Sequence, residues 1–208
     1  MKGEFYLLQI RPIVDSKQVL DEDLTAIPDE QCLLRSHNSL GHGISEDVID
    51  VVYVKAGDDF TAAENPRIAD EIEQINRKFL AGDFVTEDGM GANYVLIGPG
   101  RWGSSDPWLG IPVKWPHISA ARVIVEAGLK NYHVDPSQGT HFFQNLTSFG
   151  VGYFTVNTYP GDGILQRDIL DAMPAIEETA HVRHVRFDNP LKIMMDGKKQ
   201  HGVVLMNN

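Results

Sequence analysis

The pattern of apolar and polar positions predicts a largely buried β-sheet. Short runs rich in β-branched and other apolar residues, typical of strands buried on both faces, occur at residues 4–14, 32–35, 47–55, 94–97, 122–126, 151–157 and 181–187. Most of these runs lack a strictly alternating polar face. They therefore favour interior strands of a sheet that is covered on both sides.

One stretch has the helical period instead. Residues 65–81 carry a single apolar stripe at spacings of four, three and four: Ile68, Ile72, Ile75 and Phe79. Asn65 is suited to cap this helix, Pro66 to occupy its first position, and Gly82 to follow its end. We expect the helix to pack on the sheet and to carry no chemistry. Residues 139–146, and a stretch capped by Asp162, predict two shorter helices.

The last part of the chain predicts an antiparallel pair. Two apolar runs, residues 191–195 and 202–206, flank Asp196-Gly197, and the spacing indicates a loop wider than a two-residue turn. The expected fold is therefore α/β. It has a mixed, mostly buried sheet flanked by about three helices and ends in an antiparallel hairpin.

Composition narrows the function classes. The 208 residues carry a formal net charge of −11, which argues against binding nucleic acid or anionic membranes. No apolar stretch is long enough to span a membrane, and the first residues do not resemble a signal peptide. The single cysteine, Cys32, excludes an internal disulfide and fits a reducing cytoplasm. It lies in an apolar run, so we expect an inert, buried thiol.

Residues 94–106 are the main candidate for a ligand site. An apolar strand ends here in three glycines, where main-chain amides are open to close approach, together with a cation and short polar side chains. The predicted anion-binding residues are Gly98, Gly100, Arg101, Gly103, Ser104 and Asp106. The planar guanidinium of Arg101 suits a phosphate or a carboxylate. The structural alternative is a tight turn in which the glycines only redirect the chain and Arg101 forms a salt bridge.

The same glycines match the spacing of a dinucleotide-binding fingerprint. Glu126, at the end of a later apolar run, stands where a ribose-binding acid would be expected. That motif needs a helix beginning at the glycines. Prolines at 107, 112 and 116 and a glycine at 110 argue against one. An independent dinucleotide-binding domain is therefore the third and least favoured function.

A family resemblance comes from the first strand. Residues 5–12, Phe-Tyr-Leu-Leu-Gln-Ile-Arg-Pro, are similar to the last strand of the ATP-grasp domain in phosphoenolpyruvate synthase and pyruvate phosphate dikinase. The resemblance implies that Gln9 and Arg11 contact ATP and its phosphates, with Mg²⁺ as a candidate companion ion. The glycine-rich ATP-binding loop and the Thr-Cys-His phosphohistidine signature of that family are missing.

The resemblance also implies a domain organisation. Residues 1–30 are expected to be the terminal strand of an ATP-grasp-like domain followed by an acidic linker, and residues 31–208 an α/β tail domain. The partners are then the upstream ATP-grasp domain of a longer chain and a small anionic ligand. Under this hypothesis the chain is the C-terminal part of an ATP-dependent phosphotransferase and is not active alone. The second hypothesis is a non-catalytic scaffold or regulatory tail.

Histidines are weaker candidates. His141, among aromatic residues, is either a neutral buried side chain or a phosphate acceptor or general acid-base group. His37 and His42 lie in a polar, glycine-containing loop, and a solvated turn is a better interpretation there than a metal site.

Overall fold

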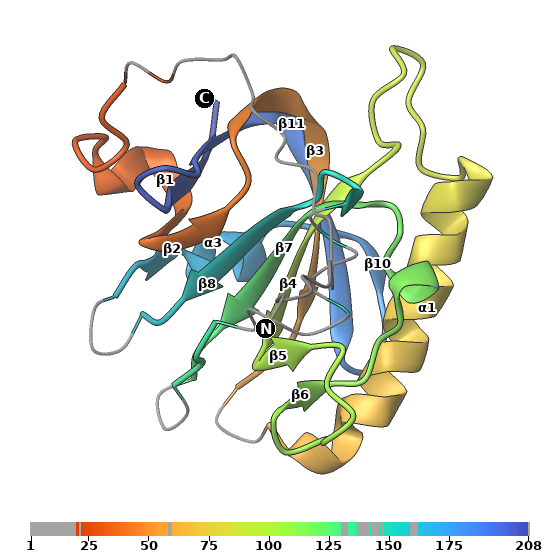
Figure 1. Ribbon diagram of the computed structural model, residues 1–208. Coiled ribbons are helices and arrows are strands. Elements are labelled where there is room, and N and C mark those ends of the chain that lie inside the picture. The colour runs from red at the N-terminus through yellow and green to blue at the C-terminus, as the bar shows by residue number, and fades with distance from the viewer. Residues whose placement is uncertain are drawn as a thin grey trace, which may run out of the picture.

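The computed structural model describes residues 20, 22–57, 60–129, 133–136, 142, 146, 148–158 and 162–207. Strands are the commonest elements in the described chain, which has one long helix (Figure 1). The elements are η1 (Asp29–Gln31), β1 (Cys32–Ser36), β2 (Asn38–Leu40), β3 (Gly43–Val54), η2 (Ala62–Glu64), α1 (Asn65–Ala81), β4 (Tyr94–Pro99), β5 (Arg101–Trp102), β6 (Gly110–Ile111), η3 (Trp115–His117), β7 (Ala121–Ala127), β8 (Gly152–Val156), β9 (Ile164–Leu165), α3 (Arg167–Ala172), β10 (Ala175–Glu178), β11 (Val182–Asp196) and β12 (His201–Leu205).

Ten of the described strands form one mixed sheet. Its order is β2-β8-β7-β4-β3-β11-β12-β1-β9, and β10 pairs with β11 outside this path. The pairs β3–β4, β4–β7 and β7–β8 are parallel, and the remaining pairs are antiparallel. The expectation of an α/β fold with a mixed sheet is confirmed.

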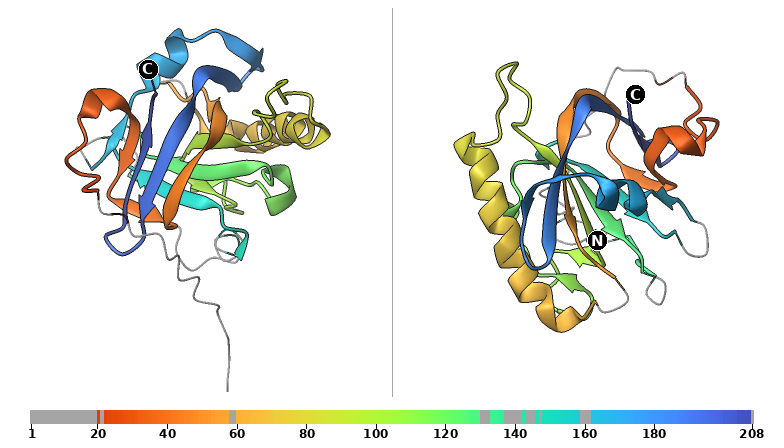
Figure 2. Two further views of the ribbon diagram at one scale, coloured as in Figure 1. Left: turned by 90° about the horizontal axis from the view of Figure 1, so that it is seen from above. Right: turned by 180° about the vertical axis from the view of Figure 1, so that it is seen from behind.

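The sheet curls back on itself (Figure 2). Near its curled edge, the amide of Ser39 in β2 donates to the carbonyl of Gln200, 2.8 Å away, beside the start of β12. The hydroxyl of Ser36 in β1 donates to the carbonyl of Thr155 in β8 at 2.6 Å. The concave face encloses a core of aliphatic and aromatic side chains, among them Val51, Tyr53 and Phe154.

Helix α1 covers the other face of the parallel strands, as both views in Figure 2 show. The predicted stripe is buried there, with Ile68, Ile72 and Ile75 fully covered. Gly82 ends the helix in the left-handed conformation, at φ 82°. The expected cap is wrong, however. Asn65 begins the helix instead of capping it, and its side-chain amide donates to the carbonyls of Pro107 and Gly110. A long-range contact has replaced the local cap.

The expectation of about three flanking helices is wrong for the described residues, where only α1 is long. The stretch after Asp162 divides into the short strand β9 and the six-residue helix α3, because β9 pairs with β1 and removes two residues from the helical run. The helix predicted at residues 139–146 lies largely outside the described residues. The loop predicted around residues 36–43 contains strand β2, which pairs with β8.

The predicted C-terminal hairpin is confirmed. Strands β11 and β12 pair antiparallel, and Asp196 stands opposite His201 across a loop of four residues. Part of the predicted acidic linker packs on this hairpin, since Leu24 and Ile27 share a small core with Met194 and Val203. In the described part of the chain, no helix has both the length and the apolar character needed to cross a membrane.

Candidate functional site

The candidate site lies at the carboxyl ends of the parallel strands, where open α/β sheets commonly bind ligands. Strand β4 runs into the glycine-containing segment, and its neighbour β7 ends at the same edge, because Gly98 pairs with Glu126 and Pro99 with Ala127. The segment then forms the short parallel pair β5–β6 beside this edge (Figure 1). The local order of strand, turn and strand follows from the prolines and glycines that exclude a helix here.

The main-chain amides of this segment are not open, contrary to the sequence-based expectation. Gly100 donates to the carbonyl of Ala127 at 3.1 Å, and Arg101 donates to that of Leu109 at 2.9 Å. Trp102 donates to Oε1 of Glu126 at 3.0 Å. Gly103 donates to the carbonyl of Ile111 at 2.9 Å. A ligand site formed by bare amides is therefore absent at these four described positions.

The glycines have structural roles in this segment. A Cβ on Gly98 would stand 2.4 Å from the indole of Trp102. Gly100 and Gly103 have φ values of 71° and 74°, in the left-handed region that favours glycine. A Cβ on Gly103 would also meet the ring of Phe142. The three glycines thus turn the chain and admit two aromatic rings.

Glu126 organises the edge of the sheet. It is 1% exposed, its Oε1 accepts the Trp102 amide, and its Oε2 accepts the hydroxyl of Tyr153 at 2.6 Å. That hydroxyl accepts a hydrogen bond from Thr155 Oγ1 at 2.9 Å. Glu126, Tyr153 and Thr155 come from neighbouring strands and point to the α1 side of the sheet. This network, together with the bond from Trp102 Nε1 to the carbonyl of Val125, fixes Trp102 in place.

These contacts overturn the dinucleotide interpretation. The carboxylate of Glu126, which that interpretation assigned to a ribose, is buried and bound to protein donors. No α-helix begins at the glycines, since the described chain from β4 to β7 contains only short strands and the single turn η3. The helix N-terminus that would face a pyrophosphate is therefore missing.

Arg101, in β5, is half-buried. On a strand, neighbouring side chains point to opposite sides, so burial of Trp102 directs Arg101 outward. Its side chain makes no hydrogen bond or ion pair with any described residue, so the predicted salt-bridge alternative finds no support here. Ser104 and Asp106 are partly engaged: the Ser104 hydroxyl bonds the main chain of Asp106, and Asp106 Oδ1 accepts the Trp108 amide.

Three predicted site residues cannot be placed. Gln9, Arg11 and His141 lie outside the described residues. Cys32 is fully buried, as expected, and burial raises the pKa of its thiol, which opposes formation of a reactive thiolate. Within the described residues, no group of three or more His, Cys, Asp or Glu side chains is placed to hold a metal ion.

The sequence interpretation missed a second buried polar cluster. Asp50 is fully buried in β3, and its Oδ1 accepts from His184 Nε2 at 2.7 Å and from Arg186 Nε at 2.9 Å. Arg186 Nη2 donates to Asp50 Oδ2 at 2.9 Å and to the carbonyl of Phe84 at 2.6 Å. In the sequence, the only sign of this cluster was an Asp inside a β-branched run, and nothing there indicated which residues would be its partners.

Comparison with known proteins gives no relative: no family model, no curated protein and no solved structure matches the chain significantly.

Proposed function

We propose that this chain is the C-terminal part of an ATP-dependent phosphotransferase resembling phosphoenolpyruvate synthase, and that Arg101 binds a phosphate or carboxylate group there. The observation that carries the proposal is the Arg101 side chain, which has no partner among the described residues and stands at the carboxyl ends of the parallel strands. A guanidinium in such a position is suited to stabilise charge on a phosphoryl group or to orient a carboxylate.

The surroundings of Arg101 support this role. Its neighbour Trp102 is held by three features: the Glu126 carboxylate, the Val125 carbonyl and the close packing on Gly98. Because the main chain is fixed on both sides of Arg101, the guanidinium is attached to a rigid base. A rigid base lowers the entropy lost when an anion is bound. The hydroxyl of Ser105, in the next turn, is a further candidate donor.

Nucleotide binding is the part of the proposal that needs more than this chain. By resemblance, Gln9 and Arg11 contact ATP, with Mg²⁺, when an upstream ATP-grasp domain is present. We propose that the chain alone does not turn over, that it works in the cytoplasm, and that His141 is the candidate to accept phosphate or move a proton.

The direct test is calorimetric titration with inorganic phosphate, phosphoenolpyruvate and ATP. We expect phosphate or phosphoenolpyruvate to bind the unaltered chain, and binding to weaken by about tenfold or more in Arg101→Ala, the range for loss of a charged hydrogen bond. Arg77→Ala is the matched control, because Arg77 is an exposed arginine on α1 that pairs with Glu73. Equal affinity in all three proteins, or no binding of any of the three anions, would reject the Arg101 site.

One observation favours the second candidate function, a scaffold or regulatory tail. Trp108 is 76% exposed and its neighbour Leu109 is 42% exposed, both at the turn between β5 and β6. Tryptophan is enriched among the residues that contribute most to binding at protein interfaces. If Trp108→Ala abolishes co-purification with a separately expressed ATP-grasp domain and Arg101→Ala changes no anion affinity, the docking function is preferred.

A further inference from the structure

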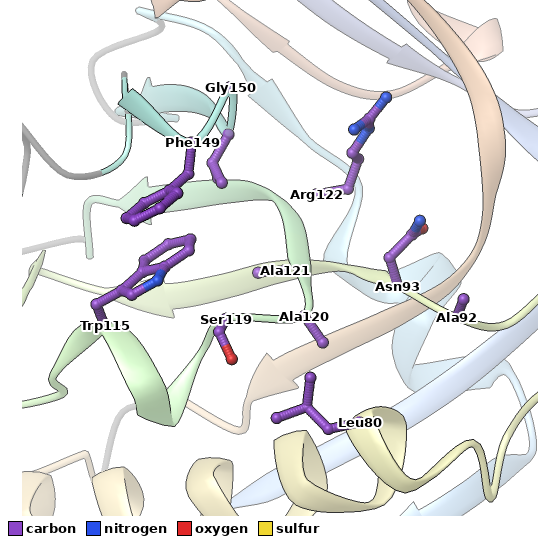
Figure 3. Close-up of a pocket in the computed structure, with 11 residues that line it drawn as sticks. Leu80, Ala92, Asn93, Trp115, Ser119, Ala120, Ala121, Arg122, Phe149 and Gly150 are labelled. Atoms are coloured by element: carbon purple, nitrogen blue, oxygen red, sulfur yellow. The ribbon is translucent and has the colours of Figure 1, made fainter.

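A groove lies at the amino ends of the parallel strands, opposite to the carboxyl ends where Arg101 lies. Its volume is about 410 Å³, within the usual range of roughly 300–1,000 Å³ for small-molecule sites. It is lined by the end of α1, the turn η3, the start of β7, and the residues just before β4 and β8 (Figure 3). Alanines at 120 and 121 leave the space between these elements open.

One wall of the groove is aromatic. The rings of Trp115 and Phe149 are stacked almost parallel, with centroids 4.8 Å apart and an interplanar angle of 6°. Phe149 is nevertheless 61% exposed, and Leu80, which also lines the groove, is 62% exposed. A stacked pair with this much apolar surface in water offers a platform for a further planar ring.

The other wall carries hydrogen-bond donors. Arg122 and Asn93 lie together at the end of the groove away from the aromatic pair (Figure 3). The side chain of Arg122 is 46% exposed, and its Nε is 3.4 Å from Ser45 Oγ and 3.8 Å from Asp47 Oδ1. Its two terminal nitrogens have no partner among the described residues.

Asn93 adds a second donor beside that cation. Its side chain lines the groove, and its Oδ1 is buried without a hydrogen-bond partner in the described part of the chain. A guanidinium and an amide N–H₂ group together provide several hydrogen-bond donors. That combination selects an anionic oxygen pair over a neutral amine.

We propose that this groove binds an aromatic carboxylate, whose ring packs on the Phe149–Trp115 pair and whose carboxylate is held by Arg122 and Asn93. The proposal is independent of the Arg101 site, which lies at the other end of the strands. The overall negative charge of the protein gives no long-range attraction to such a ligand, so the affinity comes from these local contacts.

The test uses 3-phenylpropionate as the probe, with binding followed by NMR at the indole N–H of Trp115 and the amide of Gly150. The neutral analogue 3-phenylpropanamide tests the need for charge, and hexanoate tests the need for a ring. We expect saturable shifts with 3-phenylpropionate, and at least roughly tenfold weaker binding of both analogues.

Variants locate the site. Arg122→Gln is expected to weaken the binding of 3-phenylpropionate about tenfold. Phe149→Ala is expected to make 3-phenylpropionate bind no more tightly than hexanoate. Both side chains are substantially exposed, so both variants are expected to keep the dispersed amide spectrum of the folded chain. Arg101→Ala should leave binding unchanged. Absence of saturable shifts, equal binding of the three probes, or loss of binding in Arg101→Ala but not in Arg122→Gln would overturn the proposal.

Discussion

The two ends of the parallel strands each contain a buried carboxylate, and the partners of the two differ. Near the amino end, Asp50 accepts hydrogen bonds from His184 and from two nitrogens of the Arg186 guanidinium. At the carboxyl end, Glu126 accepts hydrogen bonds from a main-chain amide and from a tyrosine hydroxyl. The first carboxylate holds a cation inside the fold, whereas the second fixes the main chain beside Arg101. Burial of an acid therefore does not by itself indicate a ligand site.

Removing the carboxylate at the amino end should have the largest effect. In Asp50→Ala, the Arg186 guanidinium, whose side chain is 23% exposed, loses its hydrogen-bonded carboxylate partner, and the fully buried His184 loses the same partner. Leaving one member of a buried pair uncompensated typically costs about 3–5 kcal/mol. We expect a loss of that size in the free energy of unfolding, measured with urea. A loss below about 1 kcal/mol would show that the cluster is not needed for stability.

The corresponding substitution at the carboxyl end is Glu126→Gln. It should have a smaller effect on stability, and that effect should include the main chain beside Arg101. Glu126→Gln keeps an oxygen for the Trp102 amide but places an N–H₂ group against the Tyr153 hydroxyl. Mismatching one buried hydrogen bond costs about 1–3 kcal/mol. Amide exchange at Trp102 and Gly103 should accelerate, while exchange at Val51 should change less. Uniform acceleration in both regions would contradict a local role for Glu126.

Much of the fold could be predicted from the sequence, and the wrong predictions have physical reasons. The periods of residues 65–81 and of the strand runs reflect burial on each element, which is local information. The use of Asn65 for a contact with Pro107 and Gly110, and the pairing of β2 with β8, depend on chain segments far apart in sequence. Local propensity cannot contain such contacts.

The same distinction between local and long-range information applies to the candidate site. The glycine pattern correctly predicted that the main chain turns here, since Gly100 and Gly103 have positive φ. It did not reveal whether the amides were free, since their acceptors lie on Leu109, Ile111, Ala127 and Glu126. Arg101 was identifiable as a cation at a strand end. The groove beside Phe149 was not, because its lining residues come from five separate segments.

A smaller, pH-dependent effect is expected at Glu71 on α1. Burial raises its pKa, but hydrogen bonds from Thr179 and His181 outweigh burial, so the pKa of the folded protein lies below the usual value of 4.5. A depressed carboxyl pKa stabilises the fold above the unfolded pKa, and this contribution is lost as the pH falls through the folded pKa.

The variant Glu71→Gln isolates that contribution. We expect it to lower the free energy of unfolding at neutral pH and to approach the unaltered chain in stability as the pH falls below 4.5. Glu73→Gln is the control, because Glu73 lies on the same helix and pairs with Arg77, whose side chain is 71% exposed. A stability difference that stays constant across this pH range would exclude a titrating contribution from Glu71.

The central claim is that Arg101 is an anion-binding cation at the carboxyl ends of the parallel strands. It is tested most directly by following the side-chain Nε–Hε NMR signal of Arg101 during titration with phosphate and with phosphoenolpyruvate. The account predicts a saturable shift of this signal at an anion concentration that leaves the Arg77 signal unchanged. An Arg101 signal that does not move, or that moves only in parallel with Arg77 as ionic strength rises, would contradict it.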